Sequence, residues 1–249
     1  MSTTRTSTGR GDSQGGFADT HWSIVLVARQ EDSPQATAAL EKLCRTYWRP
    51  LYAFIRREGH GVEDAPDLTQ EFFARLVEKK WLSHLVDQRG KFRSFLLTFL
   101  KHFLSDQRDR AGAQKRGGGR TVVSLDEFAA EERALFEPVE QRTAEQVFER
   151  RWAQTVMEQA KDRLRQEYID GGKGLLFDLL KEVQPGEHGA LTYAQLGAPL
   201  GLTEQAVKSA IHRLRRRHRE ILRKEIAQTV GSREEIDEEI QHLIGALGH

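Results

Sequence analysis

The sequence contains a single cysteine, Cys44, among its 249 residues. One thiol can form neither an intrachain disulfide nor a site with several thiolate ligands. Nine histidines are scattered without the spacing of metal ligands, and His212 and His218 would lie on different faces of a helix. We therefore expect no metal and no other cofactor.

Long apolar runs are also missing. No segment has the length and composition of a signal peptide or a membrane-spanning helix. With 38% apolar and 30% charged residues, the composition is typical of a soluble globular protein. These features predict a cytoplasmic protein that does not contact a membrane.

No segment shows the sustained alternation of a strand, whereas apolar residues recur at helical spacing from about Thr20 onward. The predicted fold is therefore all-α. Pro50 interrupts the apolar stripe between Leu40 and Ile55, and a new helix could start there. Residues 114–120, QKRGGGR, contain a glycine triplet that predicts a domain boundary. We predict a disordered N-terminus (1–18), a helical domain (19–112), a flexible acidic linker (113–144), a second helical domain (145–225) and an amphipathic tail (226–249).

The net charge is only +1, but the charges are unevenly placed. Nine Lys or Arg and two acidic residues occur in 89–120, whereas 121–150 has eight acidic residues against three Arg. Residues 205–224 then carry eight Lys or Arg against one Glu. Two basic segments on either side of an acidic one indicate a nucleic-acid-binding protein.

The second basic segment follows the pattern of a helix-turn-helix. Thr192 and Thr203 can cap two helices, and Gly201 stands where the turn between them needs positive φ. Gly197 is small where the helices would cross, and Pro199 should shorten the first helix. In this motif the second helix enters the major groove with its N-terminal residues at the base edges. The residues expected to contact DNA are Glu204, Gln205, Lys208, Ser209, His212, Arg213, Arg216 and Arg217.

Two further segments precede this motif. DAPDLTQEFFARL, at 64–76, places Asp64, Asp67 and Glu71 on one face of a helix and phenylalanines on the other. The segment GKFRSFLLTFLKHFLSDQRDR, at 90–110, interleaves basic residues with phenylalanines. Such a mixture suits single-stranded nucleic acid, although most of these phenylalanines should belong to the core. The carboxylate face favours a protein-binding surface over a catalytic site, because no histidine or nucleophile pattern accompanies it.

Together with LTYAQLGAPLGLTEQAVKSAIHRLRRRHREIL at 191–222, these segments resemble the extracytoplasmic-function group of bacterial RNA polymerase sigma factors. The resemblance covers roughly 38–110 and 145–224. It implies a non-enzymatic protein that binds core RNA polymerase and reads the −10 and −35 elements of promoter DNA. Its acidic linker would resemble the family's connector in the path of nascent RNA.

The resemblance also implies residue roles. Asp64, Asp67, Gln70 and Glu71 would contact core polymerase. The expected −10 contacts are Lys91, Arg93, Lys101, His102, Asp106 and Arg108. The family often has Asn in place of His102, so its base preference cannot be transferred to this chain.

Alternatives stay open at this point. A stand-alone helix-turn-helix regulator would bind duplex DNA without polymerase, and an enzyme could use Asp64, Asp67 and Glu71 with a divalent metal. The tail carries an apolar stripe from Ile236 to Leu247 that could pack on the protein's own core, receive a partner or cover the DNA-binding helix. Control by an anti-sigma factor, by phosphorylation or by this tail is equally compatible with the sequence, which gives no role for residues 20–42.

Overall fold

The computed structural model describes residues 34–77, 91–113, 142–181, 183 and 192–248. Within these ranges the chain is mostly helical and contains no strand, as predicted. The α-helices are α2 (Pro34–Arg57), α3 (Asp64–Val77), α5 (Phe92–Ala113), α7 (Ala144–Asp170), α8 (Gly174–Leu180), α9 (Tyr193–Gly197), α10 (Glu204–Ala227) and α11 (Glu234–Gly248), and the 3₁₀ helix η2 spans Ala198–Leu200.

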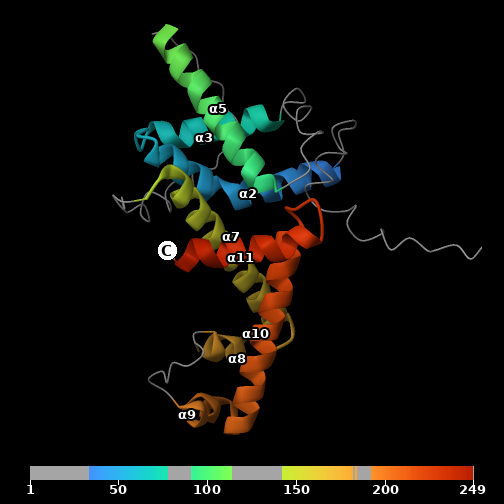
Figure 1. Cartoon of the computed structure of the whole chain (residues 1–249). Coiled ribbons are helices and arrows are strands. Elements are labelled where there is room, and N and C mark those ends of the chain that lie inside the picture. The colour runs from blue at the N-terminus through green and yellow to red at the C-terminus, as the bar shows by residue number, and fades with distance from the viewer. Residues whose placement is uncertain (1–33, 78–90, 114–141, 182, 184–191, 249) are drawn as a thin grey trace, which may run out of the picture.

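Helices α2, α3 and α5 form a bundle at one end of the molecule (Figure 1). Its core is aromatic, because α3 and α5 each bring a phenylalanine stripe to the apolar face of α2. Trp48 of α2 stacks on Phe73 of α3 with ring centroids 6.1 Å apart. Phe72 of α3 meets Phe103 of α5 edge to face at 5.7 Å. Such aromatic pairs fix the relative placement of the three helices.

Pro50 does not start a new helix, contrary to the expectation from sequence. Helix α2 continues through it from Pro34 to Arg57. Proline inside a helix removes one backbone hydrogen bond. Here the flanking residues Tyr47, Trp48 and Leu51 are fully buried, so packing against α3 and α7 outweighs the local cost.

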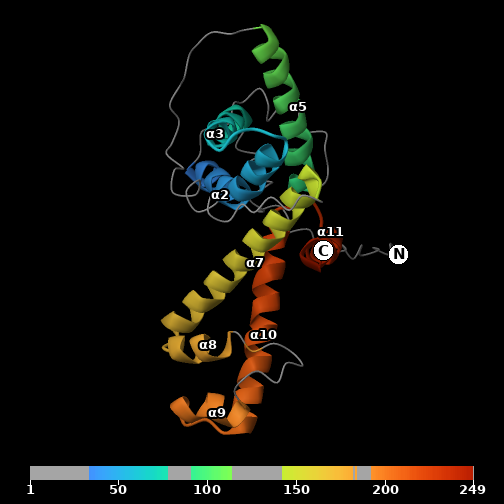
Figure 2. The same ribbon diagram turned by 90° about the vertical axis from the view of Figure 1, so that its left-hand side faces the viewer.

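Helix α7 connects the two ends of the molecule. Thr143 caps it in a capping box with Gln146. Its first half packs against α2 and α11, and its second half runs alongside α10 and against α8 (Figures 1 and 2). Trp152 and Phe148 are fully buried in the first half, and Leu164 is buried in the second.

The buried apolar side chains form one connected cluster that includes residues from both predicted helical domains. In this structure the two regions are therefore packed on each other along α7. The predicted linker, 113–144, lies largely outside the described residues, as does the whole predicted N-terminus, 1–18. The division into domains at 19–112 and 145–225 stays a prediction.

Candidate nucleic-acid interface

The end of the molecule opposite the α2–α3–α5 bundle is formed by α9 and α10, which a tight turn joins (Figure 1). Thr192 caps α9 and forms a capping box with Gln195. Thr203 caps α10 by accepting a hydrogen bond from the backbone N–H of Ala206 at 3.2 Å. Gly201 has φ of 63°, the left-handed conformation that glycine adopts without strain. The caps and the turn predicted from sequence are thus confirmed.

Gly197 and Pro199 also behave as predicted. A Cβ atom on Gly197 would lie 2.4 Å from the carbonyl oxygen of Leu202 and 2.9 Å from Cγ2 of Val207, so the two helices meet closely here. Helix α9 ends at Gly197, and Pro199 lies in the 3₁₀ turn η2 that follows. The short first helix and the close crossing together fix how α10 leaves the turn.

The first three turns of α10 bury Val207, Ala210 and Ile211 and expose the opposite face. Lys208 forms an ion pair with Glu204 at 2.6 Å, and its ammonium lies 5.4 Å from the ring centroid of Tyr193. Its hydrogen bond with Glu204 raises the pKa of Lys208, so this side chain carries a fixed positive charge. Of the remaining predicted contacts in these turns, Ser209 is half-buried and the others are exposed: Gln205, His212 and Arg213.

The arginines predicted to contact phosphate in the second half of α10 have different surroundings. Arg216 is 65% exposed, and its ion pair with Glu220 on the same helix is long, at 3.7 Å. Arg217, in contrast, donates two hydrogen bonds to Glu167 of α7 and one to Glu220. Arg215 donates to the carbonyl of Val183 at 2.9 Å. Arg217 therefore holds α10 against α7, and Arg216 faces solvent.

Helix α3 presents the predicted acidic face. Asp64, Asp67 and Glu71 are exposed and Gln70 is half-buried. Glu71 also pairs with Arg75, whose guanidinium lies 4.8 Å from the ring centroid of Phe103 on α5. In the part of the chain that the structure describes, no group of three or more His, Cys, Asp or Glu residues is arranged to hold a metal ion.

Four of the predicted −10 contacts lie on the solvent side of α5. Lys101, His102, Asp106 and Arg108 are all exposed. Two of them have acidic neighbours, since Lys101 is 2.7 Å from Glu145 and Arg108 is 2.6 Å from Glu58. Phe92, Phe99 and Phe103 are buried and Phe95 is half-buried, as expected for core phenylalanines.

Lys91 and Arg93 do not lie on this surface. Arg93 is 6% exposed, and its guanidinium lies 4.9 Å from the ring centroid of Trp152 and pairs with Glu149 and Glu239. Lys91 is directed to the same helix, α11, with Nζ 3.3 Å from Glu238. In this structure Arg93 is buried against α11 and Lys91 pairs with α11 while staying partly exposed, so their predicted contact with the −10 strand stays a prediction. Local spacing could not reveal this, because Glu239 is 146 positions away along the chain.

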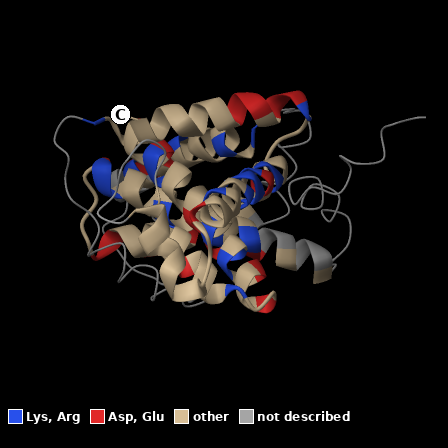
Figure 3. Ribbon diagram, turned by 90° about the horizontal axis from the view of Figure 1, so that it is seen from below, with Lys and Arg blue, Asp and Glu red and all other residues tan. Residues whose placement is uncertain are grey.

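Helix α11 packs on the protein's own core, which is the first of the three alternatives that the sequence left open for the tail. Ile236 and Leu243 are buried, and the helix packs along the first half of α7. It does not cover the first turns of α10, because it lies at the other end of that helix (Figure 1). Acidic residues gather on its first turns, where Arg223 of α10 pairs with Asp237 (Figure 3).

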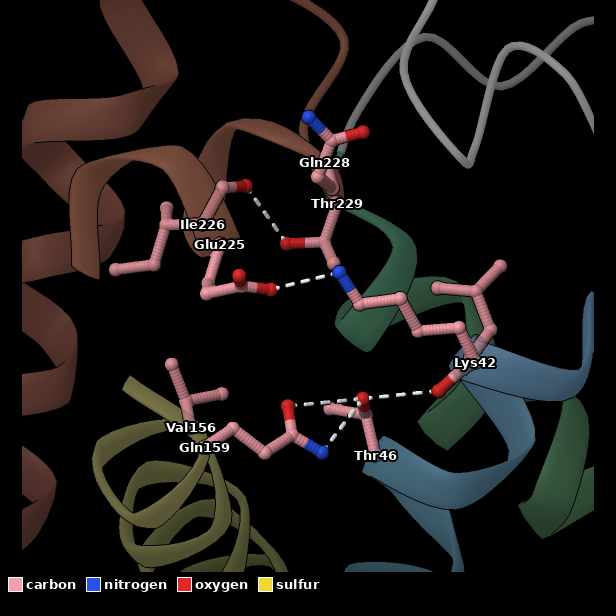
Figure 4. A pocket seen from close by; sticks show the side chains of 9 residues that line it. Lys42, Thr46, Val156, Gln159, Glu225, Ile226, Gln228 and Thr229 are labelled. Carbon is pink, nitrogen blue, oxygen red and sulfur yellow. Dashed lines mark hydrogen bonds and ion pairs between the residues drawn. The ribbon is translucent and has the colours of Figure 1, made fainter. Parts of the chain in front are cut away.

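A second charged contact joins the two regions at Glu225 of α10. Its carboxylate lies 2.9 Å from Lys42 of α2 (Figure 4). The same carboxylate lies 2.7 Å from Arg163 of α7. Burial acts to raise the pKa of Glu225, but the two cations outweigh it and hold the pKa below its usual value. A cavity of about 20 Å³ beside this contact has room for one water molecule. Sequence reasoning missed Glu225, because it is one of three acidic residues in a basic helix and its partners are remote in sequence.

Each helix within the described ranges is too short or too polar to span a lipid bilayer. Among the comparisons with known proteins, a family model described as ECF sigma factor matches residues 34–224, which is more than half of the chain. No curated protein and no solved structure matches the chain. The matched residues begin with α2 and end within the last turn of α10, so α11 lies beyond them.

Proposed function

The chain belongs to the ECF sigma factor family, and from this premise we propose that it binds core RNA polymerase through α3 and directs it to promoters by contacts of α5 and α10 with DNA. The observation that carries the proposal is the separation of two charged faces. The exposed carboxylates of α3 lie at one end of the molecule and the exposed cations of α10 extend to the other (Figure 1).

Helices α9 and α10 would act as a helix-turn-helix that reads the −35 element. The first turns of α10 would enter the major groove, where Lys and Arg donate to guanine and Gln pairs with adenine. Lys208, Gln205 and Arg213 have the side chains for such contacts and are exposed. Arg216, further along the helix, would meet backbone phosphate.

The exposed side of α5 would hold the −10 strand. Lys101 and Arg108 supply positive charge, and His102 and Asp106 can form hydrogen bonds with bases. Unstacking a base costs a few kcal/mol, so strand opening needs this binding energy. The protein would perform no chemistry of its own, since the polymerase forms the phosphodiester bonds.

The test is initiation by purified core polymerase on a genomic promoter library with and without the protein. We expect co-elution with core and initiation above that of core alone. Failure of both would overturn the proposal, and duplex binding without polymerase would then favour a stand-alone regulator.

A charge-reversal variant tests the α3 surface. Asp67→Lys with Glu71→Lys should weaken core binding while the helical signal stays unchanged. The matched control is Asp162→Lys with Asp170→Lys, which reverses two exposed carboxylates on α7. Equal loss in both variants, or normal binding in the first, would count against α3 as the contact.

A further inference from the structure

Helix α11 covers the start of α5 with acidic side chains. The carboxylate of Glu239 is 1% exposed and accepts hydrogen bonds from Nε of Arg93 at 2.8 Å and from Nη2 at 3.2 Å. Lys91 Nζ lies 3.4 Å from the same carboxylate and 3.3 Å from Glu238. The two cations at the start of α5 are therefore both neutralised by α11.

These contacts make the docked position of α11 a discrete state. A buried ionised carboxylate needs a compensating partner, and removing one member of a buried ion pair leaves the other charge desolvated and unpaired. Glu149 of α7 holds the remaining edge of the Arg93 guanidinium, and it also lies 2.9 Å from His242 of α11. For α11 to leave, Glu239 would have to be rehydrated and Arg93 would keep only Glu149 as a partner.

The same region ties α5 to the end of α10. The backbone N–H of Phe92 donates to the carbonyl of Thr229 at 3.0 Å, so α5 begins where the turn between α10 and α11 lies. The contact of Glu225 with Lys42 and Arg163 adds a second link between α10 and the first half of the chain. With α11 docked, the segments proposed to contact DNA, Lys101 to Arg108 of α5 and Gln205 to Arg213 of α10, have a fixed separation.

The distance that α5 and α10 can span is shorter than the distance between the −10 and −35 elements of a promoter. At about 1.5 Å per residue, the chain from Thr203 to Thr229 spans ~40 Å and α5 from Phe92 to Arg108 spans ~24 Å. Even if the two helices were placed end to end in a straight line, they would span only ~64 Å. Elements centred near −10 and −35 are ~85 Å apart on a straight duplex at ~3.4 Å per base pair.

We propose that α11 is an intramolecular lock, in which Glu239 holds Arg93 and Lys91 and so closes the start of α5 to DNA until α11 is released. Release exposes two further cations at the start of the helix that carries Lys101 and Arg108, and it removes the contacts of α11 with α7 and α10. The inference rests on the proposed function, because it requires that α5 and α10 contact promoter DNA. Since α11 lies outside the residues matched by the family model, the lock is an addition of this chain to the matched region.

The first experiment measures binding of the full chain, without polymerase, to short single-stranded DNA of randomised sequence. Glu239→Gln removes the charge that holds Arg93, and we expect ~5-fold to 50-fold tighter binding, which lies within the usual range for coupled equilibria. Glu238→Gln is the matched control, with the same charge change on the same helix at a side chain that is 67% exposed. It should change affinity less than ~2-fold, because exposed ion pairs contribute little.

A substitution of an uncharged residue distinguishes the effect of releasing α11 from the effect of changing its charge. Leu243 is 1% exposed, so Leu243→Ala loosens α11 without altering any charge. It should raise DNA affinity in the same direction as Glu239→Gln. Equal affinities for all three variants and the wild type would overturn the lock, and so would equal gains from Glu239→Gln and Glu238→Gln.

The position of α11 is measured directly by pulsed electron resonance between spin labels. Cysteines introduced at the exposed positions Thr98 and Gln241 report the distance from α5 to α11. Burial raises the pKa of the natural Cys44 to about 12 and so slows its reaction with label, and Cys44→Ser in every labelled chain removes this thiol from the measurement. We expect one short distance for the otherwise wild-type chain and a longer, broader distribution in both release variants and on addition of core polymerase.

The outcomes for the two proposals are distinguishable. Should the wild type neither bind core nor stimulate it, the proposed function falls, and the spin-label distances of Glu239→Gln and Leu243→Ala still decide whether α11 is locked. Should the wild type initiate normally while those distances and the DNA affinities stay unchanged, the lock falls and the sigma function stands.

Discussion

The guanidinium of Arg217 and the carboxylate of Glu167 form a two-pronged pair, with Nε 2.7 Å from Oε2 and Nη2 2.8 Å from Oε1. Hydrogen bonding to Arg217 holds the pKa of Glu167 below its usual value, so the pair is charged at neutral pH. Arg217 belongs to a basic run that sequence alone assigns to phosphate. Its partner on α7 gives it a different role, which is to fix α10 against α7.

Arg216 and Arg217 should therefore respond differently to truncation. Arg216→Ala removes a solvent-facing cation, so it should weaken binding to all promoter sequences and make the dependence of log K on log salt shallower by ~1. Arg217→Ala should leave that slope nearly unchanged and lower thermal stability. Titrations of duplex DNA at several salt concentrations, with melting curves of each variant, measure both effects. Identical slopes for the two variants would contradict the distinction.

The base-reading role of the first turns of α10 predicts changes in sequence preference. Lys208→Ala and Arg213→Ala should shift the promoters selected from a randomised −35 library, with ~1–3 kcal/mol of discrimination lost at the position each side chain reads. Arg219→Ala, an exposed position later on the same helix, is the control and should lower affinity without changing the selected sequence. An unchanged preference in both test variants would remove these residues from the reading edge.

Glu225 should make stability depend on acid pH. Its folded pKa lies below the usual 4.5, so the carboxylate stabilises the fold above pH 4.5, and this contribution is lost as the pH falls through the folded pKa. Because Lys42 and Arg163 are half-exposed, Glu225→Gln should cost only ~1 kcal/mol at neutral pH. Denaturant melts from neutral to acid pH should show the wild type and variant converging below pH 4.5. Glu158→Gln, which removes an exposed partner of Arg49, should cost less, and a constant gap down to the lowest pH would refute the linkage.

Gly197 should not accept a side chain. Its Cβ would lie 2.4 Å from the backbone oxygen of Leu202, an atom that cannot move away without opening the turn. Gly197→Ala should therefore destabilise the α9–α10 pair by ~1–3 kcal/mol and weaken duplex binding. Gly245→Ala is the matched control, because its Cβ would meet nothing within 4 Å, and a helical alanine should be neutral or slightly stabilising there. Equal melting temperatures for the two variants would disprove the close crossing.

Features that depend on neighbours in sequence were predictable. The helical periodicity, the caps at Thr192 and Thr203, the positive φ at Gly201 and the short helix before Pro199 each follow from a few adjacent residues. Pro50 is the counterexample: its local preference is to break a helix, and burial of the side chains around it overrides that preference.

Spacing and composition within single segments were enough to predict an all-α chain with an acidic helix face, two basic segments and a capped turn. Which cations remain exposed depends on how the helices pack against one another. Arg93 and Arg217 look like Lys101 and Arg216 in the sequence. Yet Arg93 is buried among carboxylates and Arg217 is held by two hydrogen bonds to Glu167 of α7, whereas Arg216 and Lys101, although Lys101 pairs with Glu145, remain exposed. The physical reason is that an ion pair depends on where two side chains meet in space, and spacing along the chain does not contain that information.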